Sequence, residues 1–166
     1  IEALSKRDDI DPDTFGLWGV NLGAYAALAT AEHDPRVRAI ALESVYDTPA
    51  DYLRLQVQRS GLMRIPLIDR MTTAEFNWKN RAEGRPVPLS QGLGKLAGVN
   101  KLFLEARDEP DLARVTHKMF LLAPEPKQEA QLDSGNYAGM LDDAKKLYEN
   151  RLLSFFLLNL PARSNR

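Results

Sequence analysis

The part of the chain that decides the fold is a glycine-flanked turn near its start, Thr14-Phe15-Gly16-Leu17-Trp18-Gly19-Val20-Asn21-Leu22-Gly23-Ala24-Tyr25-Ala26-Ala27-Leu28-Ala29. A short apolar, aromatic-rich run enters the turn, and a run of Ala and Leu with high helix propensity leaves it. The pattern predicts a strand, a sharp turn and a helix, with the residue at position 21 forced toward positive φ. Gly19 and Gly23 would give the backbones of the strand and the helix room to approach each other.

The turn Gly19-Val20-Asn21-Leu22-Gly23 has the form Gly-x-Ser-x-Gly of a nucleophile elbow, with Asn in place of Ser. Together with its flanks, Asp11–Val20 and Leu22–Ala27, it resembles the α/β-hydrolase superfamily, in particular the bacterial serine-esterase and peptidase-like branch. In that branch Asp-Pro-x-x-(Ile/Phe)-Gly-x-Trp-Gly-x-Ser-x-Gly-Gly-Tyr-Ala-Ala opens the second half of the fold. Because Asn accepts positive φ readily, Asn21 keeps the shape of the elbow and removes its hydroxyl.

The resemblance implies an α/β fold, in which a mostly parallel sheet is flanked by helices. The elbow lies in the middle of that fold, so the chain matches its C-terminal half and lacks the N-terminal strands. We expect about four strands: the one that enters the elbow and those at 36–44, 100–106 and 128–132. The continuous apolar centre of 36–44 is typical of a parallel strand that is covered on both faces. Helices are expected at 22–32, 111–122 and 141–160.

We expect residues 1–166 to form a single α/β-hydrolase-like domain. Residues 48–98 would be a helical cap-like insertion within it, with helices at 51–60, 65–80 and 89–97. Without its N-terminal strands, the parallel sheet would have an exposed edge, which favours aggregation unless something covers it. The expected partner at that edge is the N-terminal half of the fold or a second copy of the chain.

The resemblance places the other two catalytic positions late in the chain. Arg107-Asp108-Glu109-Pro110 stands where relatives have Gly-x-x-Asp-Pro, which makes Glu109 the acid and Asp108 its alternative. Both acids are equally explained as residues that the dipole of the next helix favours at its N-terminus. In the loop after the last strand, Asn136 stands where relatives carry the histidine of Gly-x-Gly-His. Asn21 and Asn136 would then face each other across the pocket and form a hydrogen bond.

Two carboxamides cannot perform serine-hydrolase chemistry, which needs a hydroxyl activated by a neighbouring base. The expected function is therefore a catalytically inactive pseudo-hydrolase that binds a small ligand in the vestigial pocket, binds a partner or serves as a scaffold. The Leu22 N–H, at the start of a helix, would remain a donor for an anion or a carbonyl. Two enzyme alternatives stay open. One is an esterase- or peptidase-like hydrolase of esters or amides with Asp47, Asp108 or Glu109 as base, and the other is a dehalogenase-like enzyme with Asn21 at the nucleophile position.

Composition narrows the classes of protein further. The chain has 166 residues, a net charge of −1, 44% hydrophobic residues and no cysteine, which is typical of a soluble globular domain. It gives no electrostatic reason to expect nucleic acid or a membrane as partner, and its longest apolar run, 152–160, is too short to span a bilayer. His33 and His117 are the only histidines. We interpret both as structural, expect no metal site and no cofactor, and favour the cytoplasm as the compartment.

Overall fold

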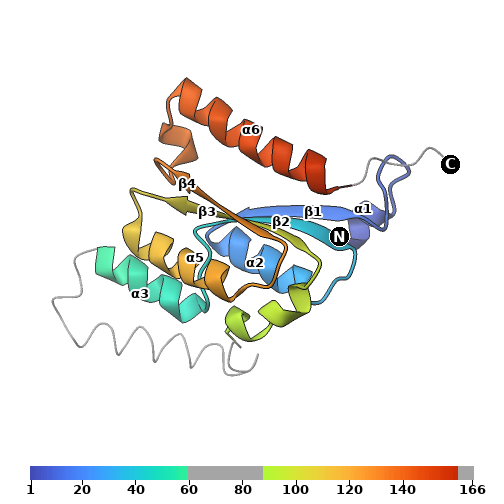
Figure 1. The fold of residues 1–166 in the computed structure, drawn as a ribbon, viewed down its shortest axis with the longest axis horizontal. Helices are drawn as coiled ribbons and strands as arrows, with labels where there is room; N and C mark the ends of the chain where they lie inside the picture. The colour runs from blue at the N-terminus through green and yellow to red at the C-terminus, as the bar shows by residue number, and fades with distance from the viewer. Residues whose placement is uncertain (60–87, 161–166) are drawn as a thin grey trace.

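The sheet at the centre of the protein is parallel throughout. The computed structural model describes residues 1–59 and 88–160. Within them, four strands pair in the order β1-β2-β3-β4, as Figure 1 shows. Their bounds are β1 Phe15–Val20, β2 Val37–Glu43, β3 Asn100–Ala106 and β4 Lys127–Leu132. Because every neighbouring pair is parallel, the carboxyl ends of all four strands meet at one edge of the sheet.

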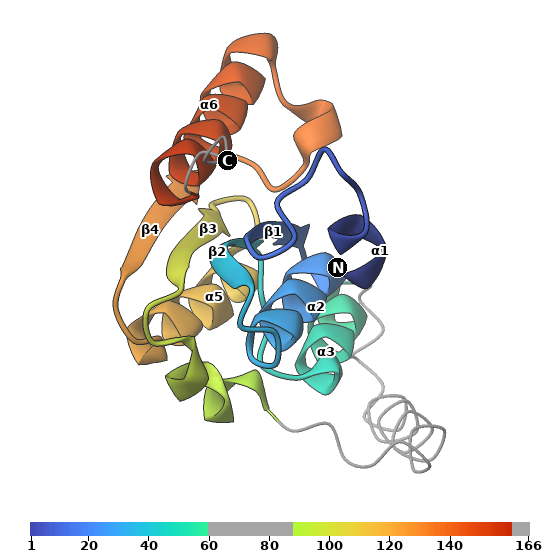
Figure 2. The same cartoon turned by 90° about the vertical axis from the view of Figure 1, so that its right-hand side faces the viewer.

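Helices cover both faces of this sheet (Figures 1 and 2). One face carries α2 (Leu22–Ala31), α3 (Pro49–Arg59) and α5 (Pro110–Leu122), and the opposite face carries α6 (Asp142–Asn159). The short elements are α1 (Glu2–Ser5), η3 (Leu89–Gln91), η4 (Leu93–Leu96) and η5 (Tyr137–Gly139). The predicted fold class, a parallel sheet between helices, is confirmed.

The alternation of side chains along β2 divides the core into two layers. Ile40 and Leu42 are fully buried on the side of α2 and α5, and Ala39 and Ala41 are fully buried on the side of α6. Successive side chains of a strand point to opposite faces, so a strand buried on both faces needs an uninterrupted apolar run. The sequence of β2 meets that requirement, as predicted.

The predicted elements are present with small shifts at their ends, except in the segment 89–97. There we expected one short helix, and the structure has the two 3-10 turns η3 and η4 separated at Gly92. A Cβ on Gly92 would lie 2.2 Å from the Glu32 carboxylate, so the side chain of the α2 C-cap residue packs directly against the glycine where the two turns meet. The expected helix at 65–80 lies outside the described residues, and the cap-like insertion 48–98 stays a prediction.

The first strand lies at one end of the described sheet. Within residues 1–59 and 88–160, β1 pairs with β2 alone. Beside that open edge, Trp18 is 51% exposed and Leu22 is 64% exposed. None of the described helices is long and apolar enough to cross a membrane.

Candidate functional site at the carboxyl ends of the strands

Asn21 occupies the bend that the sequence predicted. It follows the last residue of β1 and precedes α2, with φ 50° and ψ −112°. Its backbone N–H donates to the Glu43 carbonyl oxygen at 2.9 Å, and its carbonyl oxygen accepts from the Tyr25 N–H at 3.0 Å. The bend is therefore held to β2 on one side and to the first turn of α2 on the other. Within the described part of the chain, the buried Asn21 Oδ1 has no hydrogen-bond partner.

The glycine requirement of the bend falls on Gly19 alone. A Cβ on Gly19 would lie 2.3 Å from the backbone C and O of Gly23 and 2.5 Å from the N of Ala24. A Cβ on Gly23 would meet no atom within 4 Å. The expectation that both glycines provide room was thus correct for Gly19 in β1 and wrong for Gly23 in α2. The backbone of Gly23 takes part in the close approach, but a side chain at position 23 would not obstruct it.

A second residue with positive φ follows the neighbouring strand. Ser44, directly after β2, has φ 51° and is buried. Its Oγ donates to Glu109 Oε2 at 3.3 Å, and its N–H donates to the Leu104 carbonyl oxygen at 3.2 Å. The sequence analysis did not identify Ser44. The only available signal was a polar pair, Glu43-Ser44, at the end of an apolar strand.

The two candidate acids bind to different neighbours. Glu109 is the N-cap residue of α5 but makes no side-chain capping bond, and its carboxylate accepts from Ser44 instead. The Asp108 carboxylate accepts from Ser134 Oγ at 2.6 Å and from the Gly135 N–H at 2.8 Å. Glu109 therefore connects the end of β3 to the end of β2, and Asp108 connects it to the loop after β4.

Asn136 has a local structural role. Its Oδ1 accepts from the Gly139 N–H at 3.2 Å, which caps η5, and its own N–H donates to Ser134 Oγ at 3.0 Å. Asn21 Oδ1 receives no hydrogen bond, and Asn136 Oδ1 is used within its own loop. The structure therefore does not form the hydrogen bond that we expected between the two carboxamides.

A buried acid lies directly beside the elbow. Glu43 is 1% exposed and accepts a hydrogen bond from the Tyr148 hydroxyl of α6 at 2.5 Å. Burial raises the pKa of Glu43, and burial together with the neighbouring Glu43 raises the pKa of Tyr148. The Tyr148 ring also meets Trp18 edge to face, with 6.2 Å between the centroids. This contact fixes α6 to the ends of β1 and β2, and sequence reasoning missed it because the two partners lie 105 residues apart.

A pocket of about 310 Å³ lies between the loop after β4 and α6. Its walls include Asp133, Ser134, Gly139, Met140, Tyr148 and Arg151. Ser134 and Tyr148 link it to the acids, since they donate to Asp108 and Glu43. Its volume is at the lower end of the range for small-molecule pockets.

His33 and Asp47 have the roles of structural residues. His33 Nδ1 lies 2.9 Å from the Ala29 carbonyl oxygen at the end of α2, as expected for a histidine at a helix C-terminus. Both carboxylate oxygens of Asp47 accept hydrogen bonds from Ser90, from its N–H at 2.8 Å and from its Oγ at 2.9 Å. Asp47 therefore anchors η3.

No family model matches the chain. The chain is 49% identical to the acyltransferase drtE of Aspergillus calidoustus over 37 residues, which are 22% of this chain and 12% of that protein. Among solved structures, acetyl xylan esterase 1 of Thermoanaerobacterium sp. JW/SL YS485 is similar with a TM-score of 0.61 and 15% identity, over 95% of this chain and 49% of the esterase. A hypothetical protein of Pseudomonas aeruginosa has a TM-score of 0.61 and 15% identity over 96% of this chain and 65% of its own. The alpha/beta hydrolase GrgF of Penicillium sp. sh18 has a TM-score of 0.52 and 18% identity over 87% and 63% of the two chains.

These similarities define the class of fold. The chain has an α/β-hydrolase-like fold, and it spans about half the length of the solved esterase and less than two thirds of the other two structures. The similar proteins come from fungi as well as bacteria, so they do not support the bacterial branch named in the sequence analysis.

Proposed function

We propose that this chain is a pseudo-hydrolase, which uses the elbow of an α/β-hydrolase-like fold to bind a small polar ligand without forming an acyl-enzyme. The proposal rests on the conformation and the environment of Asn21. Asn21 holds the backbone conformation of the elbow and presents a carboxamide oxygen that is buried and accepts no hydrogen bond. A carboxamide has no ionisable group near neutral pH and forms no ester with an acyl substrate. An orphaned buried acceptor costs free energy, and a ligand donor would recover it.

The first turn of α2 supplies the complementary group. Leu22 is the first residue of the helix, its side chain is exposed, and its N–H belongs to the helix N-terminus, where donors have no partner within the helix. A ligand that matches this pair carries a carbonyl oxygen or an anion for the Leu22 N–H and an N–H or O–H donor for Asn21 Oδ1. Primary amides have both groups on one carbon, so we propose a small amide-bearing molecule as the ligand class.

Acetamide is the simplest probe of this pairing. In NMR titrations with 15N-labelled protein, we expect acetamide to shift the Leu22 amide signal, and the Asn21→Ala variant to lose that shift. Asn150→Ala, on the exposed surface of α6, is the matched control and should behave as the wild type. A titration in which Asn21→Ala and the wild type respond equally would contradict the assignment of Asn21 to the ligand.

The absence of acyl-enzyme chemistry has its own test. We expect the wild type to resist labelling by a fluorophosphonate and to leave p-nitrophenyl acetate unhydrolysed. Asn21→Ser should gain neither property, because the hydroxyl has no base beside it. Asn21→Ser combined with Asn136→His should gain labelling if the mapping of both positions is correct, and the single Asn136→His variant should not.

The enzyme alternative rests on a different observation, the hydrogen bond between Ser44 Oγ and Glu109 Oε2 at 3.3 Å. Of the three acids that were considered as base, Asp47 is held by Ser90 and Asp108 by the loop after β4, which favours Glu109. Ester turnover by the wild type that Glu109→Gln abolishes and Asp108→Asn retains would overturn the pseudo-hydrolase proposal in favour of this enzyme.

We also propose that the open edge of β1 is covered in the functional protein, by further strands of the same fold or by a second copy of the chain. The half-exposed Trp18 beside that edge supports the proposal, as do the greater lengths of the similar solved structures. Light scattering separates the two partners, because only a second copy doubles the mass. If the backbone amides of β1 exchanged hydrogen as fast as those of an unpaired strand, both kinds of partner would be contradicted.

A further inference from the structure

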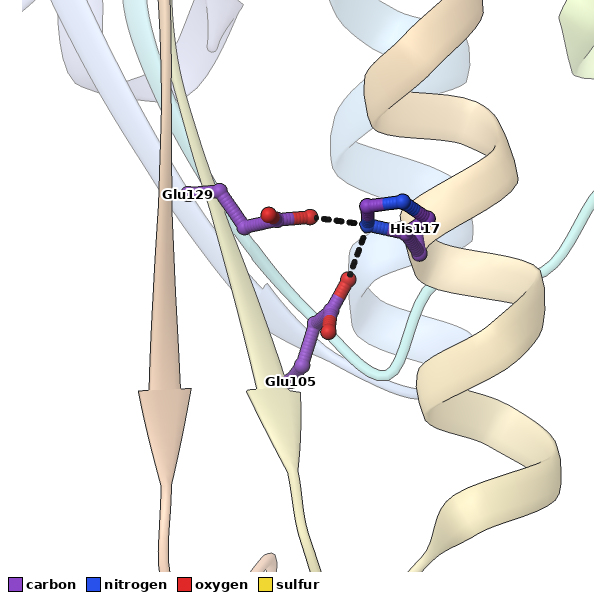
Figure 3. A group of neighbouring side chains, drawn as sticks. All are labelled: Glu105, His117 and Glu129. Carbon is purple, nitrogen blue, oxygen red and sulfur yellow. Dashed lines mark hydrogen bonds and ion pairs between the residues drawn. The ribbon is translucent and has the colours of Figure 1, made fainter.

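Three side chains from three elements converge on the side of the sheet that α5 covers, away from Asn21 and the elbow. Glu105 belongs to β3, Glu129 to β4 and His117 to α5, and Figure 3 shows them pointing toward one another. The strand register explains the meeting of the two acids. Glu129 pairs with Phe103, two residues before Glu105, so the two glutamates are diagonal neighbours on one face.

The distances between the side chains are those of a ligand cluster. His117 Nδ1 lies 2.6 Å from Glu129 Oε1 and 3.3 Å from Glu105 Oε1. One ligand atom of each residue lies within 4.8 Å of the others. Donors that surround a tetrahedral metal ion at about 2.1 Å are separated from each other by roughly 3.4 Å. The pair of Glu105 and His117 already has that spacing, and Glu129 needs to move away by about 1 Å or less.

Glu105 supplies a second and independent observation. Its side chain is only 9% exposed, and its Oε1 accepts no hydrogen bond, although it points at the other two side chains. The hydrogen bond of His117 Nδ1 is made with Glu129 Oε1 instead. A buried carboxylate oxygen without a donor costs free energy. The buried Glu105 Oε1 therefore has the 3.3 Å contact with His117 Nδ1 but no hydrogen bond, and it faces the centre of the cluster.

We propose that Glu105, His117 and Glu129 bind one divalent ion of the first transition series, with Zn²⁺ as the preferred ion. Two carboxylates balance the charge of the ion, and the imidazole selects it over Mg²⁺ and Ca²⁺, which prefer about six or more oxygen ligands. Three protein ligands leave one position of a tetrahedral ion open for water, and the half-exposed His117 side chain gives solvent a path to it.

The bound ion would connect β3, the edge strand β4 and α5. In the structure, His117 joins these strands through a hydrogen bond to Glu129 and a 3.3 Å contact with Glu105, and its own side chain is half-exposed. The site is independent of the proposed pseudo-hydrolase function, because it shares no residue with Asn21, Leu22 or Glu109. It also changes the expectation that two histidines are too few for a metal site, since one histidine with two carboxylates suffices.

Isothermal titration calorimetry of the metal-free protein with ZnCl₂ tests the proposal, with MgCl₂ and CaCl₂ as comparison ions. We expect one Zn²⁺ per chain, a rise in Tm with Zn²⁺ concentration, and no measurable heat from Mg²⁺ or Ca²⁺. His117→Gln and Glu129→Gln should each weaken Zn²⁺ binding by about tenfold or more. His33→Gln, which removes the histidine at the end of α2, should bind as the wild type does.

Absence of a stoichiometric Zn²⁺ site would overturn the proposal, and so would an equal loss of affinity in His33→Gln and His117→Gln. Co²⁺ provides a measurement on the unaltered protein that does not depend on how the variants fold. A tetrahedral Co²⁺ site gives intense visible absorption that Zn²⁺ displaces in a 1:1 ratio, as the proposal requires. Only weak octahedral absorption from Co²⁺ would refute the proposed tetrahedral geometry.

Discussion

The elbow depends on the absence of a side chain at one position, and the pair Gly19→Ala and Gly23→Ala separates that requirement from a general preference for glycine. Both residues flank Asn21 in the same motif, and both substitutions add one methyl group. In the structure, a Cβ added at position 19 would enter the backbone of α2, and a Cβ added at position 23 would meet nothing within 4 Å. Gly19→Ala should therefore be destabilised and Gly23→Ala should not.

The geometry sets the size of each effect. The new methyl at position 19 would lie 2.3 Å from the carbonyl carbon and oxygen of Gly23, where carbon atoms normally keep about 3.5 to 4.0 Å. Overpacking that flexible side chains relieve costs about 1 to 3 kcal/mol. Here both sides of the contact are backbone, so we expect Gly19→Ala to lose at least about 3 kcal/mol. Gly23 lies in α2, where alanine is favoured over glycine by roughly 0.5 to 1 kcal/mol, so Gly23→Ala should be neutral or more stable.

Urea unfolding followed by tryptophan fluorescence and by far-UV circular dichroism measures both free energies, and coincident transitions establish two-state behaviour. The expected difference between the two variants is about 4 kcal/mol. A loss below about 1 kcal/mol for Gly19→Ala would refute the close contact between β1 and α2. A Gly23→Ala variant as unstable as Gly19→Ala would show that the whole motif resists substitution for another reason.

Three further predictions concern the polar groups at the carboxyl ends of the strands. Tyr148→Phe removes the donor to the buried Glu43 carboxyl and should cost about 1 to 3 kcal/mol in thermal or urea unfolding, whereas a change below the error of the measurement would contradict the hydrogen bond. Because burial raises the pKa of Glu43 in the folded state, its contribution to stability is full below the unfolded-state pKa and is lost as pH rises through the folded-state pKa. Glu43→Gln should therefore lessen the fall in stability at pH values above the unfolded-state pKa of Glu43, and an unchanged pH profile would refute the raised pKa of Glu43. Asp47→Ala removes both bonds to Ser90 and should destabilise by about 1 to 3 kcal/mol, more than Ser90→Ala, which keeps the bond to its N–H; the reverse order would show that Asp47 does not anchor η3.

Most of the sheet could be predicted from the sequence, because β1, β2 and β3 have apolar centres that end at turn residues, whereas β4 has only two apolar residues, Ala130 and Leu132. The bounds predicted for β3, 100–106, are those observed, since its apolar centre Leu102-Phe103-Leu104 is buried on both faces of the sheet and marks the strand. The prediction of one helix at 89–97 was wrong, because apolar residues at helical spacing do not reveal a contact from elsewhere in the chain. Glu32, which lies far earlier in the sequence, occupies the space beside Gly92.

The site was predictable only in part. The position of Asn21 in the bend followed from the local motif, and the acids at the end of β3 were placed by the resemblance of Arg107-Asp108-Glu109-Pro110 to a family motif. No sequence motif predicted the positive φ of Ser44. The cluster at His117 depends on the register between β3 and β4, which the sequence of either strand alone does not contain.

The strained backbone at Asn21 and Ser44 is enforced by contacts that do not depend on the side chain at position 21. Both have positive φ at the ends of neighbouring strands, a conformation that costs about 1 to 3 kcal/mol at a residue with a side chain and is kept only where its surroundings enforce it. The enforcing contacts are backbone bonds to Glu43 and Leu104 and the approach of α2 to Gly19, none of which involves the side chain at position 21. The geometry of the bend is therefore set by the sheet and α2, and it does not depend on the side chain at position 21.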